Sequence, residues 1–255
     1  MEQSIQGTKV YEEEEYPEIP VSAKYQETMV TVTSYRTLQA AGLLHKSNLG
    51  KRIAVHNFAS GTNPGGGVTN GSSAQEECLC RCSTLYPVLK TPMLWEKYYK
   101  FHRERHDTRY TDTCIYTPAV YVMKTDTEMP VPMAKEEWYQ VDVLTCAAPN
   151  LRPCSYPSDG VKFTQTIKVS DRELLEIHKK RARHMFAVAI ANKVDILVLG
   201  AFGCGAFQNK PEIVARAYKE IIEEFQGRFH RIEFAVFCTM KDTRNYDVFQ
   251  RVLQE

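Results

Sequence analysis

The chain has 255 residues, 43% of them hydrophobic and 11% aromatic, which is enough to build one sizeable core. Its 32 basic and 31 acidic residues leave a net charge of +1, so the overall balance argues against direct nucleic-acid binding by counterion release. The sequence contains neither a signal-peptide pattern nor a stretch near the ~18 apolar residues of a membrane span. We therefore expect a cytoplasmic protein, or a nuclear one in a eukaryotic source, with no membrane partner and with its eight cysteines reduced.

The amino-terminal part of the chain leads into a glycine-rich segment. Residues 1–25 are polar, with an acidic run and two prolines, and we expect an extended arm before one domain that spans residues 26–255. A short strand begins at Met29, and a helix follows over 37–44. The compact apolar run at 53–58 predicts a buried strand, and the glycine-rich segment follows its carboxyl end. Open α/β sheets place their ligands at such strand ends.

The rest of the chain alternates between predicted helices and strands. The helices are expected at 73–89, 92–105, 171–192, from Pro211 to about Phe225, and at 246–253. The strands are expected at 113–122, 139–147, 195–199 and 234–238, with a polar excursion at 124–137 and a loop at 152–170. Serines at 72 and 73 are candidate caps for the first of these helices, and Ser170 is the candidate cap for the third. This alternation predicts an α/β fold with a mixed, mainly parallel sheet covered on both faces.

Two glycine-rich loops, at 61–67 and 200–205, each follow an apolar strand. Glycines let a ligand lie against the backbone and permit a positive φ. The second loop leads into a helix with Asn209 as the expected cap and Pro211 in the first turn, and the N–H groups of such a helix start bind anions. Two such loops facing each other would clasp a diphosphate. The alternative is that the glycines only permit tight turns.

Gln75-Glu76-Glu77 is separated from the last glycine of the first loop by seven residues. Carboxylates repel a phosphate, so two adjacent acids suit a site that cleaves a bond beside a phosphate. Acids at a helix start also complement the helix dipole by ~0.3–1 kcal/mol, which is a purely structural alternative. That dipole would lower their pKa, so we expect the neighbouring carboxylate and a bound diphosphate to raise the pKa of a proton donor. One acid should do the chemistry and the other orient the substrate, because adjacent helix residues point about 100° apart.

Three further side chains have two possible roles each. Phe207 follows the second loop and could stack on a sugar or belong to the core. Asn57 and Asn63 flank the first loop and could stabilise turns or present an amide to a ribose hydroxyl.

A metal site is not expected. Cys78, Cys80 and Cys82 are two residues apart, so on a helix they face different directions, and the chain has no Cys-x-x-Cys pair. His102 and His106 have a spacing that a metal can use, but their strongly charged surroundings favour a solvated helix face.

The pattern Gly-Gly-Gly, seven residues, Gln-Glu-Glu resembles the signature of the bacterial-type poly(ADP-ribose) glycohydrolases, which are macrodomains. Four blocks resemble the same family in the same order, at 57–68, 81–86, 147–150 and 200–211. The resemblance extends over about residues 28–254 and leaves the first 25 outside. It implies a macrodomain-like three-layer α/β/α fold, ADP-ribose bound across the strand ends, and neither a metal nor another cofactor.

The resemblance also implies a role for individual residues. Glu77 would protonate the leaving ribose oxygen and then take a proton from the attacking water. Glu76 would position ribose hydroxyls, and Gln75 would support the acidic loop. Phe207 would pack against the terminal ribose, and Asn63 would hold a ribose hydroxyl. The remaining expected substrate contacts come from the two loops: Gly65, Gly66, Gly67, Val68, Gly203, Cys204, Gly205 and Ala206.

The expected reaction is hydrolysis of ribose–ribose O-glycosidic bonds in poly(ADP-ribose), from chain ends, with release of ADP-ribose. The expected partner is the ADP-ribose polymer on modified proteins, and we expect the enzyme to be a monomer. Two alternatives stay open: a macrodomain that only binds ADP-ribose, and a hydrolase of mono-ADP-ribosyl groups. The acid pair argues against the first, because a binding module needs the cradle but not the acids.

Overall fold

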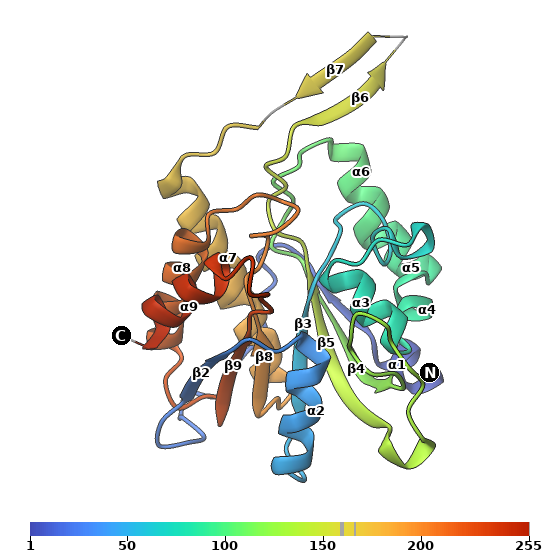
Figure 1. The fold of residues 1–255 in the computed structure, drawn as a ribbon. Coiled ribbons are helices and arrows are strands. Elements are labelled where there is room, and N and C mark those ends of the chain that lie inside the picture. The colour runs from blue at the N-terminus through green and yellow to red at the C-terminus, as the bar shows by residue number, and fades with distance from the viewer. Residues whose placement is uncertain (159–160, 166, 255) are drawn as a thin grey trace.

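A twisted seven-stranded sheet forms the middle of the molecule (Figure 1). The computed structural model describes residues 1–158, 161–165 and 167–254. In spatial order the strands are β1 (Lys9–Tyr11), β4 (Cys114–Val122), β5 (Tyr139–Cys146), β3 (Ile53–Phe58), β8 (Ile196–Leu199), β9 (Arg231–Ala235) and β2 (Met29–Thr33). The sheet is parallel from β5 to β2, whereas β4 and β1 join antiparallel at one side. The expected mixed, mainly parallel sheet is confirmed.

The sheet topology fixes where a ligand can bind. The parallel strands β3, β5, β8 and β9 end at the same edge, so the loops that follow them gather there. β8 is buried along its whole length and β3 is buried except at its last residue, which explains why both read as continuous apolar runs.

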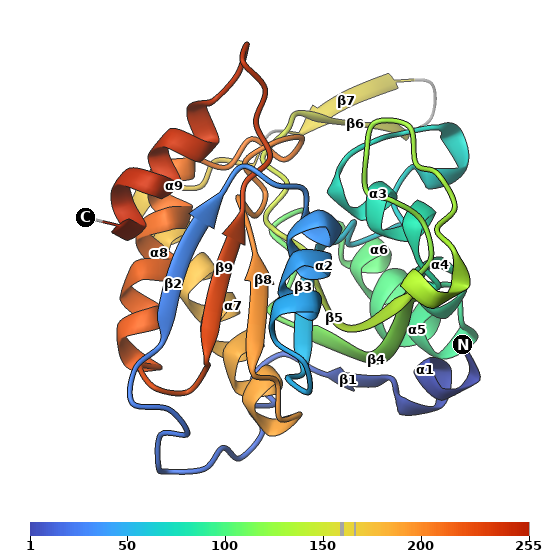
Figure 2. The same ribbon diagram turned by 60° about the horizontal axis from the view of Figure 1, so that its bottom comes forward.

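Helices cover both faces of the sheet, which gives three layers (Figure 2). Their bounds are α1 (Glu2–Gly7), α2 (Thr37–Ser47), α3 (Gln75–Cys82), α4 (Leu85–Leu89), α5 (Pro92–Leu94), α6 (Phe101–Arg105), α7 (Asp171–Ala191), α8 (Pro211–Glu224) and α9 (Arg244–Gln254). α7, α8 and α9 pack on one face, and α2 to α5 supply most of the helical core of the other. Within the described residues, no helix is long and apolar enough to cross a bilayer.

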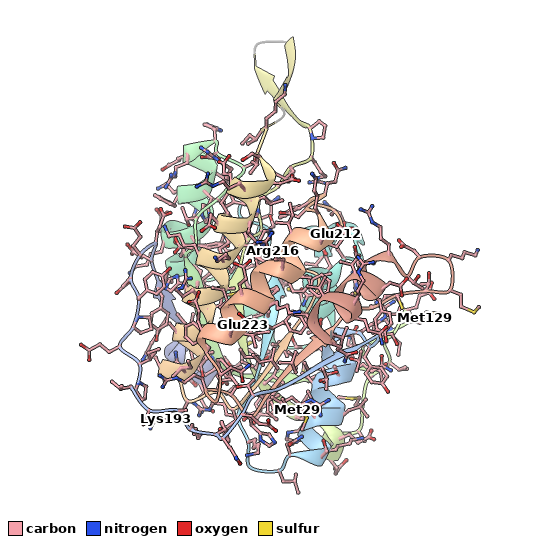
Figure 3. All side chains as sticks on the ribbon, turned by 90° about the vertical axis from the view of Figure 1, so that its left-hand side faces the viewer. Met29, Met129, Lys193, Glu212, Arg216 and Glu223 are labelled. Carbon is pink, nitrogen blue, oxygen red and sulfur yellow. The ribbon has the colours of Figure 1, made fainter. Side chains whose placement is uncertain are left out.

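α8 has one face buried against the core and one face exposed. Pro211 begins it, as predicted, and Val214 and Tyr218 are among the residues that it buries. Its opposite face carries Glu212 and Arg216, which are exposed and point outward in Figure 3. The helix is therefore amphipathic and presents its first turn to the strand-end edge.

Residues 1–25 are not simply an extended arm. They contribute α1 and the edge strand β1, which pairs with β4. Ser4 is fully buried and donates its hydroxyl hydrogen to the carbonyl of Ala119 at 2.8 Å. Farther along, the Arg228 guanidinium binds three successive carbonyls at residues 20–22. These contacts join positions more than 100 residues apart, so the local composition of the segment did not indicate them.

Two further predictions need correction. The helix expected at 73–89 is divided into α3 and α4, because Ser83 is extended (φ −139°, ψ 179°) and bridges to Val122. The loop expected at 152–170 contains a hairpin of β6 (Cys154–Ser158) and β7 (Val161–Gln165), which projects from the body of the molecule in Figure 1. Its pairing is made by backbone groups, which side-chain periodicity does not specify. The parts of that prediction at 159–160 and 166 lie outside the described residues.

Candidate functional site

A cleft of about 790 Å³ opens at the carboxyl ends of the parallel strands. The loops after β3, β5, β8 and β9 line it, together with the first turns of α2 and α3. Its volume lies in the range of ~300–1,000 Å³ that small-molecule sites occupy. Both glycine loops and the acid pair therefore meet in one cavity, as the sequence predicts.

The first glycine loop is shaped to let the acid pair approach its backbone. Gly66 has a φ of +58°, and a Cβ atom there would collide with the carboxylate of Glu77 and lie 3.1 Å from that of Glu76. The N–H group of Gly67 donates to Oε1 of Glu77 at 2.8 Å. The missing side chains thus accommodate the protein's own carboxylates as well as any ligand.

Gln75 fastens the start of α3 to the end of β3. Its Nε2 donates to the carbonyl of His56 at 2.7 Å, and its Oε1 accepts the N–H of Phe58 at 2.9 Å. The capping role expected for the serines at 72 and 73 is wrong, because Ala74 is the N-cap and makes no side-chain bond. The glutamine amide fixes where the two following acids lie.

Glu76 is buried beside Glu77, with 3% of its surface exposed. It accepts the N–H of Ser60 at 2.7 Å and the amide of Asn57 at 3.4 Å. Burial raises the pKa of Glu76 to about 8, and the charge of Glu77 adds to this shift. The neighbouring acid thus contributes to the raised pKa of Glu76, but burial is the larger cause.

Asn57 has neither of the roles considered for it. The side chain is completely buried, so it lies beneath Glu76 and away from the cleft. Its Nδ2 also donates to Thr145 Oγ1 at 3.3 Å. Asn57 therefore holds the buried acid from below.

Glu77 faces the cleft, and 8% of its surface is exposed. Its Oε1 is held by the backbone of the first glycine loop. Within the described residues, its Oε2 makes no hydrogen bond, so this oxygen is available to a ligand. One acid is buried and uncharged near neutral pH, and the other is anchored and open.

Gly203 and Asn209 shape the second loop. Gly203 has a φ of +75°, and a Cβ there would lie 2.5 Å from the Cβ of Ala148. Asn209 is not the helix cap that the sequence predicts, because Lys210 is the N-cap of α8. Its Nδ2 instead donates to the carbonyls of Pro149 at 2.7 Å and Gly203 at 3.1 Å. The asparagine ties this loop to the segment after β5.

Phe207 has an aromatic and a cationic neighbour at the cleft. Phe207 lines the cleft, and its ring centroid lies 6.4 Å from that of Tyr110. The Arg152 guanidinium lies 5.8 Å from the Phe207 ring centroid. Phe207 also packs on the edge of the core, so the packing role is confirmed, and its place in the cleft wall leaves it able to contact a ligand.

The structure places most of the expected site residues on the cleft wall. Those that line it are Asn63, Gly66, Gly67, Gln75, Glu76, Glu77, Gly203, Gly205, Ala206 and Phe207. Gly65, Val68 and Cys204 lie in the same loops but off the wall: Gly65 lies against Tyr86, and the other two pack on the hydrophobic clusters.

The cleft wall also contains residues that the sequence did not indicate. Arg36 lies at the start of α2, with its guanidinium 4.1 Å from the ring centroid of Phe237. Asp126, from the polar excursion, also lines this cavity. Phe237 could have been found from its position at the carboxyl end of a predicted strand. Arg36 and Asp126 had no such signal.

The described residues contain no group of three or more His, Cys, Asp or Glu side chains that could hold a metal ion. Burial raises the pKa of Cys80 and of Cys82, so both remain protonated thiols. The prediction for His102 is wrong: the side chain is 2% exposed and contacts Thr111 Oγ1 at 3.0 Å, whereas His106 is exposed.

The chain is similar to a known family of enzymes and to solved structures of its members. A family model described as the microbial-type PARG catalytic domain matches residues 1–125. Poly(ADP-ribose) glycohydrolase from Deinococcus radiodurans, in complex with ADP-ribose, is 33% identical; the match covers 98% of this chain and 95% of that chain, with a TM-score of 0.78. No match is found among curated proteins.

A second solved relative is poly(ADP-ribose) glycohydrolase from Thermomonospora curvata. It is also 33% identical, and the match covers 98% of this chain and 87% of that chain, with a TM-score of 0.82. Another structure of that protein is bound to the inhibitor ADP-HPD. Since the family model matches from residue 1, the first 25 residues belong to the region of similarity, contrary to the expectation from sequence.

Proposed function

The chain belongs to the microbial-type poly(ADP-ribose) glycohydrolases, and we propose that it cleaves the ADP-ribose polymer by acid–base catalysis through Glu77. It is a glycohydrolase with a macrodomain-like α/β fold that binds ADP-ribose. The observation that carries the catalytic assignment is the geometry of the two acids. One oxygen of Glu77 is anchored on Gly67 while the other opens to the cleft, and the buried Glu76 lies beside it.

The second glycine loop is the proposed diphosphate site. Gly205 has no atom within 4 Å of where its Cβ would lie, so this part of the loop leaves room for a ligand in the cleft. Backbone N–H groups in such a loop can bind phosphate oxygens without a lysine or arginine. A diphosphate held there places the terminal ribose toward Asn63 and Phe207, which line the same cleft.

Glu76 supports the chemistry by staying neutral. Its raised pKa keeps the proton on its carboxyl at pH 7, so it can donate a hydrogen bond to a ribose hydroxyl. A neutral neighbour also adds no negative charge to a site that must accept a diphosphate. This is the physical reason for burying one acid and leaving the other open.

The proposed reaction has two proton transfers. Glu77 gives a proton to the leaving ribose oxygen as the bond from the anomeric carbon to that oxygen breaks, which leaves an oxocarbenium-like ribose. Water then attacks this carbon and returns a proton to Glu77. Because the same group acts as acid and then as base, no second carboxylate is required as a nucleophile.

We also propose that the enzyme works as a monomer and removes single ADP-ribose units from chain ends. The described cleft is formed by one chain, and its volume suits a ligand of about one ADP-ribose unit. The test is a time course on end-labelled poly(ADP-ribose), with products separated by chain length. Release of ADP-ribose from the first turnover supports cleavage from ends, and early short oligomers would refute it.

The two other functions predict different results in the same assay. A binding module would take up ADP-ribose but leave the polymer intact. A hydrolase of mono-ADP-ribosyl groups would release ADP-ribose from singly modified protein faster than from polymer. The acid pair in the cleft favours hydrolysis over binding alone, because a module that only binds the diphosphate has no use for a carboxyl group that is open to the ligand.

A further inference from the structure

A second cavity of about 370 Å³ lies beside the main cleft. Asn63 lines both cavities, so they meet at the first glycine loop. The second cavity extends toward α6 and the segment that follows this helix, with Arg103, His106, Asp107 and Tyr110 in its wall. It therefore adjoins the main cleft at a proposed contact of the terminal ribose.

Arg103 gives the second cavity a positive charge. Its Nε donates to the carbonyl of Thr62 at 2.8 Å, and its Nη2 donates to Oδ1 of Asn63 at 2.5 Å. The guanidinium also lies 4.8 Å from the ring centroid of Trp95. None of these partners is an anion, and Arg103 forms no ion pair within the described residues. The cation is thus held in place and not neutralised.

The one carboxylate in the cavity wall does not cancel this charge. Asp107 is paired with the Arg109 guanidinium at 2.8 Å, and that pairing lowers its pKa. The pair is close to neutral as a unit, so Arg103 dominates the local potential. The cavity therefore favours a ligand with negative charge.

The backbone around the cavity is held in an unusual shape. His106 and Tyr110 are non-glycine residues with φ values of +52° and +57°. The ring of Tyr110 lies where a Cβ on Gly61 would be, 2.6 Å from its nearest carbon, so the first loop has no side chain there. Thr108 hydrogen-bonds Asn150 through both its hydroxyl and its carbonyl. Left-handed residues that persist in a well-bonded segment are enriched at binding sites.

Tyr110 lies in the wall of the second cavity and close to a residue of the main cleft. Its ring lies near Phe207, which forms part of the cleft wall. Asn63 and Phe207 are the proposed contacts of the terminal ribose, so the second cavity lies next to the proposed ribose site. This position and the positive charge of Arg103 together indicate the class of ligand that the second cavity binds.

We propose that the second cavity binds the adenosine-phosphate unit on the far side of the scissile bond, which becomes the leaving group. This inference rests on the proposed function. Arg103 meets a phosphate of that unit, and the Tyr110 ring offers an aromatic surface to its nucleoside. The main cleft then binds the ADP-ribose that is released. The second cavity binds the next unit of the chain, which only a polymer has.

The test compares two substrates that share the terminal ADP-ribose. One is poly(ADP-ribose); the other carries 4-nitrophenol at the anomeric carbon in place of the second nucleotide. The variant Arg103→Ala should lower kcat/KM about 10-fold for the polymer, the scale of one charge-assisted hydrogen bond, and less than about twofold for the nitrophenyl substrate. An equal loss on both would mean that Arg103 acts only by positioning Asn63, and it would overturn the proposal.

Arg105→Ala is the matched control. This residue lies two positions away on α6, is exposed like Arg103, pairs with the exposed Glu13 at 3.7 Å, and is absent from the cavity wall. It removes the same charge and should leave both substrates unchanged. A loss on the polymer equal to that of Arg103→Ala would indicate general attraction of a polyanion, and the cavity would have no specific role. Failure of the unmodified enzyme on both substrates would refute the proposed function itself.

Discussion

His178 on α7 holds Asn209 of the second loop through a buried hydrogen bond of 2.9 Å between Nε2 and Oδ1. The Nδ2 group of Asn209 donates to carbonyls, so its Oδ1 is the acceptor and Nε2 of His178 is the donor. Burial lowers the pKa of His178 to about 3, so the ring stays neutral in this arrangement. The long helix thereby sets the shape of the proposed diphosphate loop, although its residues do not line the cleft.

Asn209→Ala should weaken ADP-ribose binding about 10-fold, because the loop carbonyls lose their donor and the loop loses its fixed shape. Calorimetric titration with ADP-ribose measures the change. Asn192→Ala is the control: that amide binds the carbonyl of Val188 and the Tyr11 hydroxyl at a site remote from the cleft. It should lower Tm without changing Kd. Equal affinities for the two variants would contradict the role assigned to Asn209.

Glu77→Gln should lower kcat on poly(ADP-ribose) by about 10²-fold or more, the usual scale for a lost general acid. The amide keeps an oxygen for the Gly67 N–H, so the loop and the ADP-ribose Kd should change little. Single-turnover kinetics and calorimetry measure the two quantities separately. A loss of affinity as large as the loss of rate would make Glu77 a binding residue.

Glu76 should make stability depend on pH in a defined window. Its pKa is about 8 in the folded chain and near 4.5 when unfolded, so the folded state holds the extra proton between these values. Stability is therefore greatest below the unfolded pKa and decreases as pH rises toward 8, by at most about 1.4 kcal/mol per pH unit.

Denaturant unfolding of the wild type and of Glu76→Gln, at pH 5 to 8, tests this. The glutamine variant cannot titrate, so its stability relative to wild type should increase with pH. Parallel curves for the two proteins would show that Glu76 is ionised throughout.

Gly66→Ala should reduce both stability and activity. Residue 66 needs a positive φ, and the added Cβ would displace the Glu77 carboxylate. Gly71→Ala is the control, because Gly71 has a φ of +80° but no atom within 4 Å of the added Cβ. Both variants should lose roughly 1–2 kcal/mol of unfolding free energy from backbone strain, and Gly66→Ala should also lose about 10-fold in kcat. Similar kcat values for the two variants would show that a side chain at residue 66 does not disturb the catalytic role of Glu77.

Features that depend on residues close together in the chain could be predicted from the sequence alone. The apolar runs at 53–58 and 195–199, each followed by glycines, predict two buried strands and a ligand edge, since a parallel sheet brings strand ends together. The spacing from the glycines to Gln75 predicts a catalytic cleft. These signals are local in the chain, so they can be read without coordinates.

Features that depend on contacts between distant segments could be learned only from the three-dimensional structure. Burial beneath the first loop gives Glu76 its raised pKa, and no pattern near residue 76 indicates how much water is excluded there. Asn209 looks like a helix cap in sequence, but its amide is used by carbonyls and by His178 from another helix. β1 pairs with a strand about 100 residues away. Burial and long-range hydrogen bonding depend on distances in space and not on distances along the chain. Burial therefore keeps Glu76 neutral, and long-range hydrogen bonds hold the second loop.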